Sequence, residues 1–211
     1  MSAEKYHITQ YCSIENAEVR LNGECVFRSK LLKASAFLKE FYRHLEMNYP
    51  KFYKMDALCK LALLCFEQLQ QVYPVNEKYP SDAIALVLCN KHASLQTDVQ
   101  HQKSIQNKLD YFPSPAVFVY TLPNIMLGEI AIRHKIKGEN ACLVQENFDA
   151  EQFYNYCNNL FLSGQTECII GGWGDFFEND YSTHLLCIEK NKNTEHSLPF
   201  EKNTLKKLFT N

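Results

Sequence analysis

The nine cysteines are the side chains of this sequence with the widest chemical scope, as nucleophiles or as metal ligands. No two of them form a Cys-x-x-Cys pair, and no combination with histidine has the spacing of a zinc site. Most lie in apolar sequence, as Cys89 does behind residues 84–88, and free cysteine commonly packs as a small buried hydrophobe. The pattern predicts reduced thiols in the core of a cytoplasmic protein, with no metal site and no cofactor.

The composition is that of an ordinary globular chain without a charge bias. The 211 residues are 46% hydrophobic and 22% charged, which is enough apolar sequence for one domain with a substantial core. The net charge of −2 gives no electrostatic reason to expect nucleic acid or an anionic membrane as a partner. We expect no membrane span and no signal peptide, because no apolar run approaches the ~20 residues that a span requires.

Hydrophobic periodicity divides the chain into alternating strands and helices. Asn22-Gly23 between two short runs predicts a hairpin, and the apolar run at residues 83–89 predicts a strand covered on both faces. Strands are expected at residues 6–14, 17–21, 24–27, 83–89, 141–145, 167–172 and 182–189. Helices are expected at residues 31–45, 55–69, 94–109, 124–134, 149–162 and 205–209. This order predicts an α/β domain whose largely parallel sheet carries helices on both faces.

Two segments near the end of the chain have a simple structural interpretation. The glycine-rich segment 171–174 lacks the spacing of a phosphate-binding loop, so we expect a strand that ends there in a tight turn. Asp175, Glu178 and Asp180 lack the spacing of a calcium loop, so we expect a solvated loop.

The helix expected at residues 149–162 has two different faces. Its polar face carries glutamate, glutamine and asparagine, and its apolar side chains fall on one stripe. The stripe consists of Phe153, Tyr156, Cys157, Leu160 and Phe161. We therefore expect one buried face and one face that meets water or a polar partner.

Several short motifs follow one another in a distinctive order between residues 112 and 175. They are Ser114-Pro115-Ala116-Val117-Phe118, Thr121-Leu122-Pro123-Asn124, Gly128-Glu129-Ile130-Ala131, Gly138-Glu139-Asn140, Ser163-Gly164 and Ile169-Ile170-Gly171-Gly172. Their order and spacing resemble the N-terminal half of β-ketoacyl-acyl-carrier-protein synthases, members of the thiolase-like superfamily. The resemblance implies a thiolase-like half with a mixed, mostly parallel five-stranded sheet at residues 1–195. A C-terminal tail with a short helix is then expected at residues 196–211.

The resemblance also implies where the reacting group would lie. The family's nucleophilic cysteine stands at the tenth position of the motif counted from Gly138, and that position here is Asn147. A carboxamide cannot accept an acyl chain as a thiolate does. The nearest cysteines, Cys142 and Cys157, fall in the expected strand and inside the expected helix. Neither is placed at a helix N-terminus, where the dipole would lower a thiol pKa.

The family builds its site from two similar halves, and the second half supplies two histidines that stabilise the enolate and the oxyanion. The sequence ends about 22 residues after the strand that resembles the last one of the first half, so we expect no second half. None of the seven histidines matches those motifs, and all are expected to be surface or packed side chains: His7, His44, His92, His101, His134, His184 and His196.

A first half without its nucleophile resembles the truncated ketosynthase-like proteins of aryl-polyene, flexirubin or dialkylresorcinol pathways, and also chain-length factors. The resemblance implies a subunit, inactive alone, that pairs with a complete ketosynthase and an acyl carrier protein and shapes the acyl channel. Fatty acid, aryl-polyene or polyketide-type biosynthesis would be its setting. Phe118, Thr121 and Asn124 are the residues that the resemblance places against substrate.

Two other functions remain open. Asn147 at a helix N-terminus would polarise an acyl carbonyl, which suits acyl transfer, decarboxylation or thioester hydrolysis in the same pocket. The chain would otherwise be a module that binds an acyl group or carrier protein, or a homodimer. In the family, the strand before the nucleophile pairs with its copy across a two-fold axis. The corresponding interface here consists of Ala141, Cys142, Leu143, Val144 and Gln145.

Overall fold

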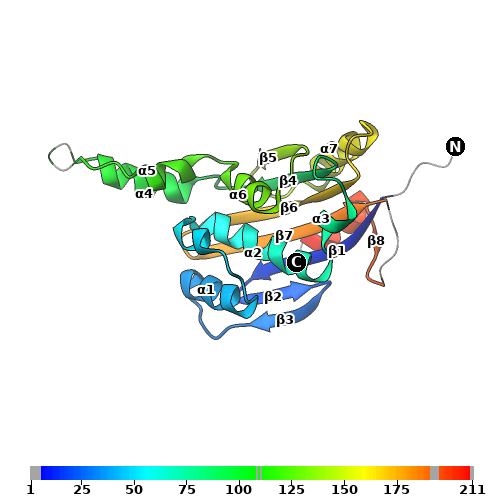
Figure 1. Ribbon diagram of the computed structural model, residues 1–211, viewed down its shortest axis with the longest axis horizontal. Coiled ribbons are helices and arrows are strands. Elements are labelled where there is room, and N and C mark those ends of the chain that lie inside the picture. The colour runs from blue at the N-terminus through cyan, green and yellow to red at the C-terminus, as the bar shows by residue number, and fades with distance from the viewer. Residues whose placement is uncertain (1–5, 108, 110, 191–194, 210–211) are drawn as a thin grey trace.

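The computed structural model describes residues 6–107, 109, 111–190 and 195–209, and it centres on one mixed sheet (Figure 1). The strands are β1 (His7–Glu15), β2 (Glu18–Leu21), β3 (Glu24–Arg28), β4 (Ile84–Asn90), β5 (Asn140–Val144), β6 (Cys168–Phe177), β7 (Asp180–Glu189) and β8 (Leu198–Pro199). Their order across the sheet is β3-β2-β1-β7-β6-β4-β5, and β8 pairs with β1 outside this path.

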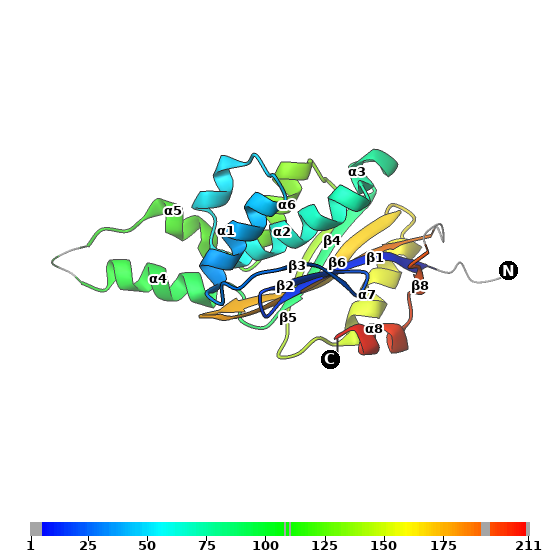
Figure 2. The same cartoon turned by 90° about the horizontal axis from the view of Figure 1, so that it is seen from below.

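The helices form a layer on each face of the sheet (Figure 2). One layer contains α1 (Ala34–His44), α2 (Ala57–Val72), α3 (Val75–Lys78) and α6 (Ile125–His134), with a 3-10 turn, η1, at Pro50–Lys54. The other layer contains α7 (Ala150–Leu162) and α8 (Lys202–Phe209). An arm projects beyond the end of the sheet, formed by α4 (Leu95–Ile105), α5 (Pro115–Phe118) and the 3-10 turn η2 (Val119–Thr121).

The predicted α/β class is confirmed, but the prediction of a mostly parallel five-stranded sheet is wrong. Only β4–β5 and β4–β6 pair in parallel, whereas β1 pairs antiparallel with β2, β7 and β8 and the β2–β3 and β6–β7 pairs are also antiparallel. The described sheet has eight strands. Part of the error lies in the β6–β7 hairpin, whose turn the sequence pattern placed too early.

The glycines at residues 171–174 lie inside β6 instead of ending it. A Cβ atom at Gly171 would press on the Val87 carbonyl and the Phe153 ring, and one at Gly172 would overlap the His184 carbonyl. Glycine in a strand can thus mark a close approach of another chain segment and not a turn. The hairpin turn lies later, where Glu178 has a positive φ of 57°.

The core on the α2 side of the sheet is the larger of the two. It contains fully buried aromatic rings from α1, η1 and α2, namely Phe37, Phe41, Phe52 and Phe66. Helix α2 is apolar around most of its circumference and is buried from Leu58 to Leu69 apart from half-buried Lys60. The Asp56 side chain caps this helix by accepting from the Cys59 N–H at 2.8 Å. This face therefore fixes the sheet by ordinary apolar packing.

The core on the α7 side is smaller and includes the end of the chain. Phe153, Cys157 and Phe161 come from the predicted apolar stripe of α7, while Phe200 and Leu205 come from the C-terminal segment. The short helix predicted at residues 205–209 is present within α8, and β8 adds a strand to β1. The division between residues 1–195 and 196–211 stays a prediction, and residues 191–194, 210 and 211 lie outside the described residues.

No single helix within the described ranges has the length and apolar character needed to cross a membrane. One pair of segments, Pro115–Thr121 and Ile125–His134, passes on length and composition together, but it is bent by 102°.

Candidate functional site

The junction between β5 and α7 holds Asn147, the position that the resemblance assigns to a nucleophile. Asn147 is exposed in the loop between Val144, the last residue of β5, and Ala150, the first residue of α7. It precedes the N-cap of α7, Asp149, by two positions. The sequence therefore placed the loop and the helix correctly, but the carboxamide lies outside the first turn of α7.

The N-terminus of α7 is already occupied by a side chain. Asp149 Oδ1 accepts from the Glu151 N–H at 2.9 Å and from the Gln152 N–H at 3.0 Å. An N-terminal carboxylate also suits the positive end of the helix dipole. The two amides that would otherwise stabilise an oxyanion at this helix end are thus hydrogen-bonded within the chain.

Gln145 ties the loop to its surroundings on both sides. Its backbone N–H donates to the Asn90 carbonyl at 2.8 Å, and its side-chain oxygen accepts from the Asp149 N–H at 2.8 Å. Its side-chain nitrogen donates to Gln152 Oε1 at 3.3 Å and to Cys89 Sγ at 3.4 Å. The loop is therefore held at both ends, while Asn147 itself faces outward.

An aromatic stack lies beside Asn147 and involves the C-terminal helix. Phe148 stacks on Phe209 with ring centroids 3.7 Å apart, and it also meets Phe153 at 5.2 Å. Phe209 with Lys206 completes an open hollow of about 510 Å³ along residues 145–152. The loop thus rests on α8 and borders a wide, solvent-open depression.

The thiols nearest to this loop are buried or half-buried, and they have raised pKa values. Burial raises the pKa of Cys89 to about 12, and it also raises the pKa of Cys142 in β5 and of Cys157 inside α7. A catalytic thiol requires the opposite shift. The sequence identified Cys142 and Cys157 as the nearest thiols, but it missed Cys89, which reaches the loop from β4.

The three predicted substrate-binding residues lie where the arm joins the body of the molecule. Phe118, at the end of α5, is 61% exposed, and its ring centroid is 5.5 Å from that of His101. The Thr121 hydroxyl donates to the Phe118 carbonyl at 2.7 Å. Asn124 is exposed at the N-cap position of α6 without a side-chain capping bond.

β5 contacts the segment that connects the arm to α6. Cys142 Sγ donates to the Pro123 carbonyl at 3.4 Å, which joins the predicted interface strand to the predicted substrate-binding segment. β5 is the terminal strand of the sheet, so one of its backbone edges is unpaired within the described residues. Val144 at its end is 57% exposed. Ala141, Cys142, Leu143 and Gln145 are half-buried along the same edge.

The arm carries an unusual share of exposed apolar side chains. These are Leu95, Val99, Leu109, Tyr111, Phe112, Phe118, Val119 and Leu122, with exposures from 39% to 98%. Within α4, Thr97 is the one fully buried side chain. Contiguous apolar surface of this kind commonly marks a binding site.

The sequence missed a histidine–aspartate pair at the carboxyl end of β4. His92 Nδ1 lies 2.6 Å from Asp175 Oδ2, and Asp175 Oδ1 accepts the backbone N–H groups of Lys91 and His92. The expectation that Asp175 belongs to a solvated loop is wrong, because this residue lies in β6 with its side chain 14% exposed. Glu178 does occupy the turn. No motif links residues 92 and 175, so only the sheet brings them together.

Comparison with known proteins finds structural but not sequence relatives. No family model matches the chain, and no curated protein matches its sequence. One similar solved structure is the ishigamide ketosynthase/chain length factor, with a TM-score of 0.67 and 16% identity over 90% of this chain and 63% of that chain.

Two further structures have the same fold. The first is a type II PKS acyl-carrier protein in complex with its ketosynthase bound to the hexaketide (AntDE:AntF), with a TM-score of 0.61 and 10% identity over 88% of this chain and 62% of that one. The second is the ketosynthase ApeO in complex with its chain length factor ApeC from Xenorhabdus doucetiae, with a TM-score of 0.59 and 14% identity. That match covers 98% of this chain and 90% of the other.

These matches confirm that the chain shares its fold with ketosynthase and chain length factor structures, as the resemblance implies. The chain spans less than two thirds of the matched chains in the first two structures and nine tenths of the matched chain in the third.

Proposed function

We propose that this chain is a non-catalytic ketosynthase-like subunit, comparable to a chain length factor, that pairs with a complete ketosynthase and receives an acyl carrier protein. Polyketide or aryl-polyene-type biosynthesis is the proposed setting, with fatty acid synthesis as a related possibility. The observation that carries the proposal is the exposed carboxamide of Asn147, at the position that the resemblance assigns to the nucleophile, in a fold that ketosynthases share.

The chemistry around Asn147 supports a role without acyl transfer. An acyl acceptor needs a thiolate or an activated hydroxyl. Burial raises the pKa of all three neighbouring thiols, Cys89, Cys142 and Cys157, so each stays protonated at neutral pH. The N–H groups of the first turn of α7 are held by Asp149. These features remove both the nucleophile and a free oxyanion site from this loop.

The surface around β5 supports a role in pairing. The exposed Val144, the open edge of β5 and the apolar arm all adjoin the contact between Cys142 and Pro123. An open strand edge is a template for pairing with another chain. Phe118, Thr121 and Asn124 are proposed to contact the acyl chain from the partner's side of this surface.

The relatives supply a precedent for such a pair. The similar structures include a ketosynthase in complex with its chain length factor and a ketosynthase in complex with its acyl-carrier protein. The match that covers 90% of the other chain shows that a chain of comparable length takes part in the first of these complexes. All nine cysteines are free, which fits our proposal that the subunit acts in the cytoplasm.

A binding experiment with matched variants tests the proposal. A complete ketosynthase from the same organism should co-elute with the chain at micromolar concentration. Val144→Glu, at the β5 edge, should weaken the complex by at least about tenfold, because it buries an unpaired charge in the interface. Leu162→Glu at the end of α7 is the control, since Leu162 is also exposed, at 71%, but lies away from β5. Absence of any complex, or equal loss with both variants, would contradict the proposal.

The alternatives give different results in the same preparation. If the chain forms a homodimer through β5, light scattering without a ketosynthase should give a dimeric mass, and Val144→Glu should abolish the dimer. An enzyme of changed chemistry predicts turnover of malonyl or acyl thioesters that is lost in Asn147→Ala. A binding module predicts that the carrier protein binds equally well with and without the ketosynthase.

A further inference from the structure

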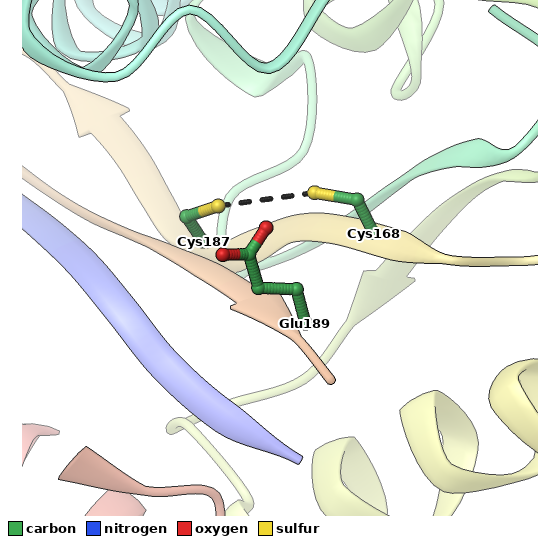
Figure 3. Close-up of side chains that lie close together, drawn as sticks. All are labelled: Cys168, Cys187 and Glu189. Carbon is green, nitrogen blue, oxygen red and sulfur yellow. Dashed lines mark hydrogen bonds between the residues drawn. The ribbon is translucent and has the colours of Figure 1, made fainter. Parts of the chain in front are cut away.

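The start of β6 and the end of β7 bring two thiols and a carboxylate together inside the core (Figure 3). Cys168 Sγ lies 3.8 Å from Cys187 Sγ, and one ligand atom from each of Cys168, Cys187 and Glu189 lies within 4.8 Å of the other two. All three side chains are at most 1% exposed. Cys168 stands opposite Glu189 in the antiparallel register, and Cys187 precedes Glu189 by two residues. The three side chains therefore share the α2 face of the sheet.

We propose that Cys168, Cys187 and Glu189 bind a thiophilic divalent metal ion, with Zn²⁺ as the type, in a structural site. Two thiolates at about 2.3 Å from a tetrahedral ion are about 3.8 Å apart, and this is the separation of the two sulfur atoms here. Two sulfurs and one carboxylate form a donor set that zinc accepts. The fourth position is left to a water molecule or to the second oxygen of Glu189.

The surroundings of Glu189 provide the second observation. Both of its oxygens accept from tyrosine hydroxyls, Oε1 from Tyr73 and Oε2 from Tyr79, the latter at 2.5 Å. No Lys, Arg or His within the described part of the chain forms an ion pair with this buried carboxylate. The two hydroxyl groups satisfy the buried carboxylate and fix its orientation. Carboxylate ligands of metals are typically oriented by such outer hydrogen bonds.

Binding of the ion does not change the net charge of the cluster. The ion displaces the two thiol protons, which pass to solvent, so that one divalent cation meets two thiolates and one carboxylate. The remaining single negative charge is near Lys78, whose Nζ lies 3.1 Å from the ring centroid of Tyr73. Tyr79, which donates to Glu189, also lines a surface hollow of about 360 Å³.

A disulfide between the same cysteines fits the register less well. Cys168 and Cys187 occupy diagonal positions of the β6–β7 pair. Diagonal positions typically have Cα atoms ~7–8 Å apart, and a disulfide rarely spans more than about 7 Å. A metal ion bridges this separation without moving the strands.

A second buried pair of cysteines provides a matched control. Cys65 Sγ donates to the Cys12 carbonyl at 3.3 Å, and both residues are at most 1% exposed. No carboxylate joins this pair in a ligand cluster within the described residues. Both pairs of cysteines are therefore buried. Within the described residues, only the pair of Cys168 and Cys187 has a carboxylate beside it.

The test uses the reduced full chain and Co²⁺ as a spectroscopic substitute for Zn²⁺. We expect one equivalent of Co²⁺ to give a thiolate-to-cobalt charge-transfer band that Zn²⁺ displaces. Cys168→Ser and Cys187→Ser should weaken binding by at least ~100-fold, whereas Cys65→Ser should leave it unchanged. Tyr79→Phe should weaken it by about 10–100-fold through the lost outer hydrogen bond.

X-ray absorption of the Zn²⁺-loaded wild type gives an answer even if the serine variants fail to fold. Two sulfur ligands with oxygen in the remaining positions would support the site. A first shell without sulfur, a folded wild type without any charge-transfer band, or an unchanged band in Cys168→Ser would each overturn the proposal.

Discussion

The two faces of the sheet differ in how completely they are covered. The α2 face is packed by α1, α2 and α6, and its rings Phe37, Phe41, Phe52 and Phe66 are fully buried. The α7 face is covered by α7 and the short C-terminal helix α8 (Figure 2). The loop with Asn147 lies at the edge of the thinner face, next to α8. Stability is thus concentrated on one face and the candidate function on the border of the other.

The arm and the β5 edge extend this contrast. They expose apolar side chains that a stable core would bury, as Phe112 does at 84% exposure. Surfaces of this kind are costly to leave in water, so a partner is the simplest reason for retaining them. The substitutions below measure how much each face contributes to the stability of the fold.

The largest loss of stability should come from the α2 face. Phe66→Ala removes a fully buried ring from the centre of α2 and should lower the free energy of unfolding by about 3–5 kcal/mol. Urea unfolding followed by circular dichroism measures this difference. A loss below that of any α7-face variant would contradict the assignment of the main core to the α2 face.

A smaller loss is expected from the C-terminal helix. Leu205 is fully buried on the α7 face, and Leu205→Ala should cost about 2–3 kcal/mol, because the short helix can settle onto the cavity. Lys207→Ala on the exposed side of the same helix should stay within about 0.5 kcal/mol. Equal effects of the two substitutions would show that α8 does not pack on the sheet as described.

A charged contact between α2 and α6 should make stability depend on pH. Burial raises the pKa of Glu67, but hydrogen bonds from His134 and Arg133 outweigh it, so the pKa is lowered overall. The hydrogen-bonded Glu67 carboxylate therefore contributes to the stability of the fold above its unfolded pKa of about 4.3. This contribution to stability is lost as the pH falls through the lower pKa of the folded state.

Glu67→Gln should therefore cost about 1–3 kcal/mol at pH 7, and the difference should shrink at acidic pH. Unfolding curves of wild type and variant across pH 3–7 measure it. A difference that grows on acidification would contradict the lowered pKa.

The smallest effect should come from the helix caps. Asp149→Ala removes the cap of α7 and should cost about 1 kcal/mol. Asp56→Ala should cost more, because Asp56 caps α2 and also accepts from the Thr97 hydroxyl at 3.0 Å. Thermal unfolding of both variants shows which substitution lowers the stability more. A larger loss in Asp149→Ala would contradict the expectation that the cap of α2 contributes more than the cap of α7.

Much of the local structure could be predicted because its causes are local. The Asn22-Gly23 hairpin, the buried strand β4 and the two-faced helix α7 follow from turn geometry and hydrophobic period. The place of Asn147 between the predicted strand and the predicted helix was also visible, and its correspondence to the family's nucleophile stays a prediction. The cap was not predicted, in which the Asp149 side chain accepts from the first N–H groups of α7.

Contacts between distant segments could not be predicted from spacing. The glycines at 171–174 predicted a turn, because the sequence does not show that the His184 and Val87 carbonyls press against β6. The contact between His92 and Asp175 was not predicted either, because the two residues are separated by 83 positions and no local pattern connects them.

The sequence by itself determined the α/β class, most helix and strand positions and the carboxamide at Asn147, since these depend on side-chain type and on periods of a few residues. Only the tertiary structure decided the antiparallel β6–β7 pairing, the open edge at β5 and the cluster of Cys168, Cys187 and Glu189. Strand order and register depend on which distant apolar faces pack together, and that choice is made by the whole core and not by any one segment.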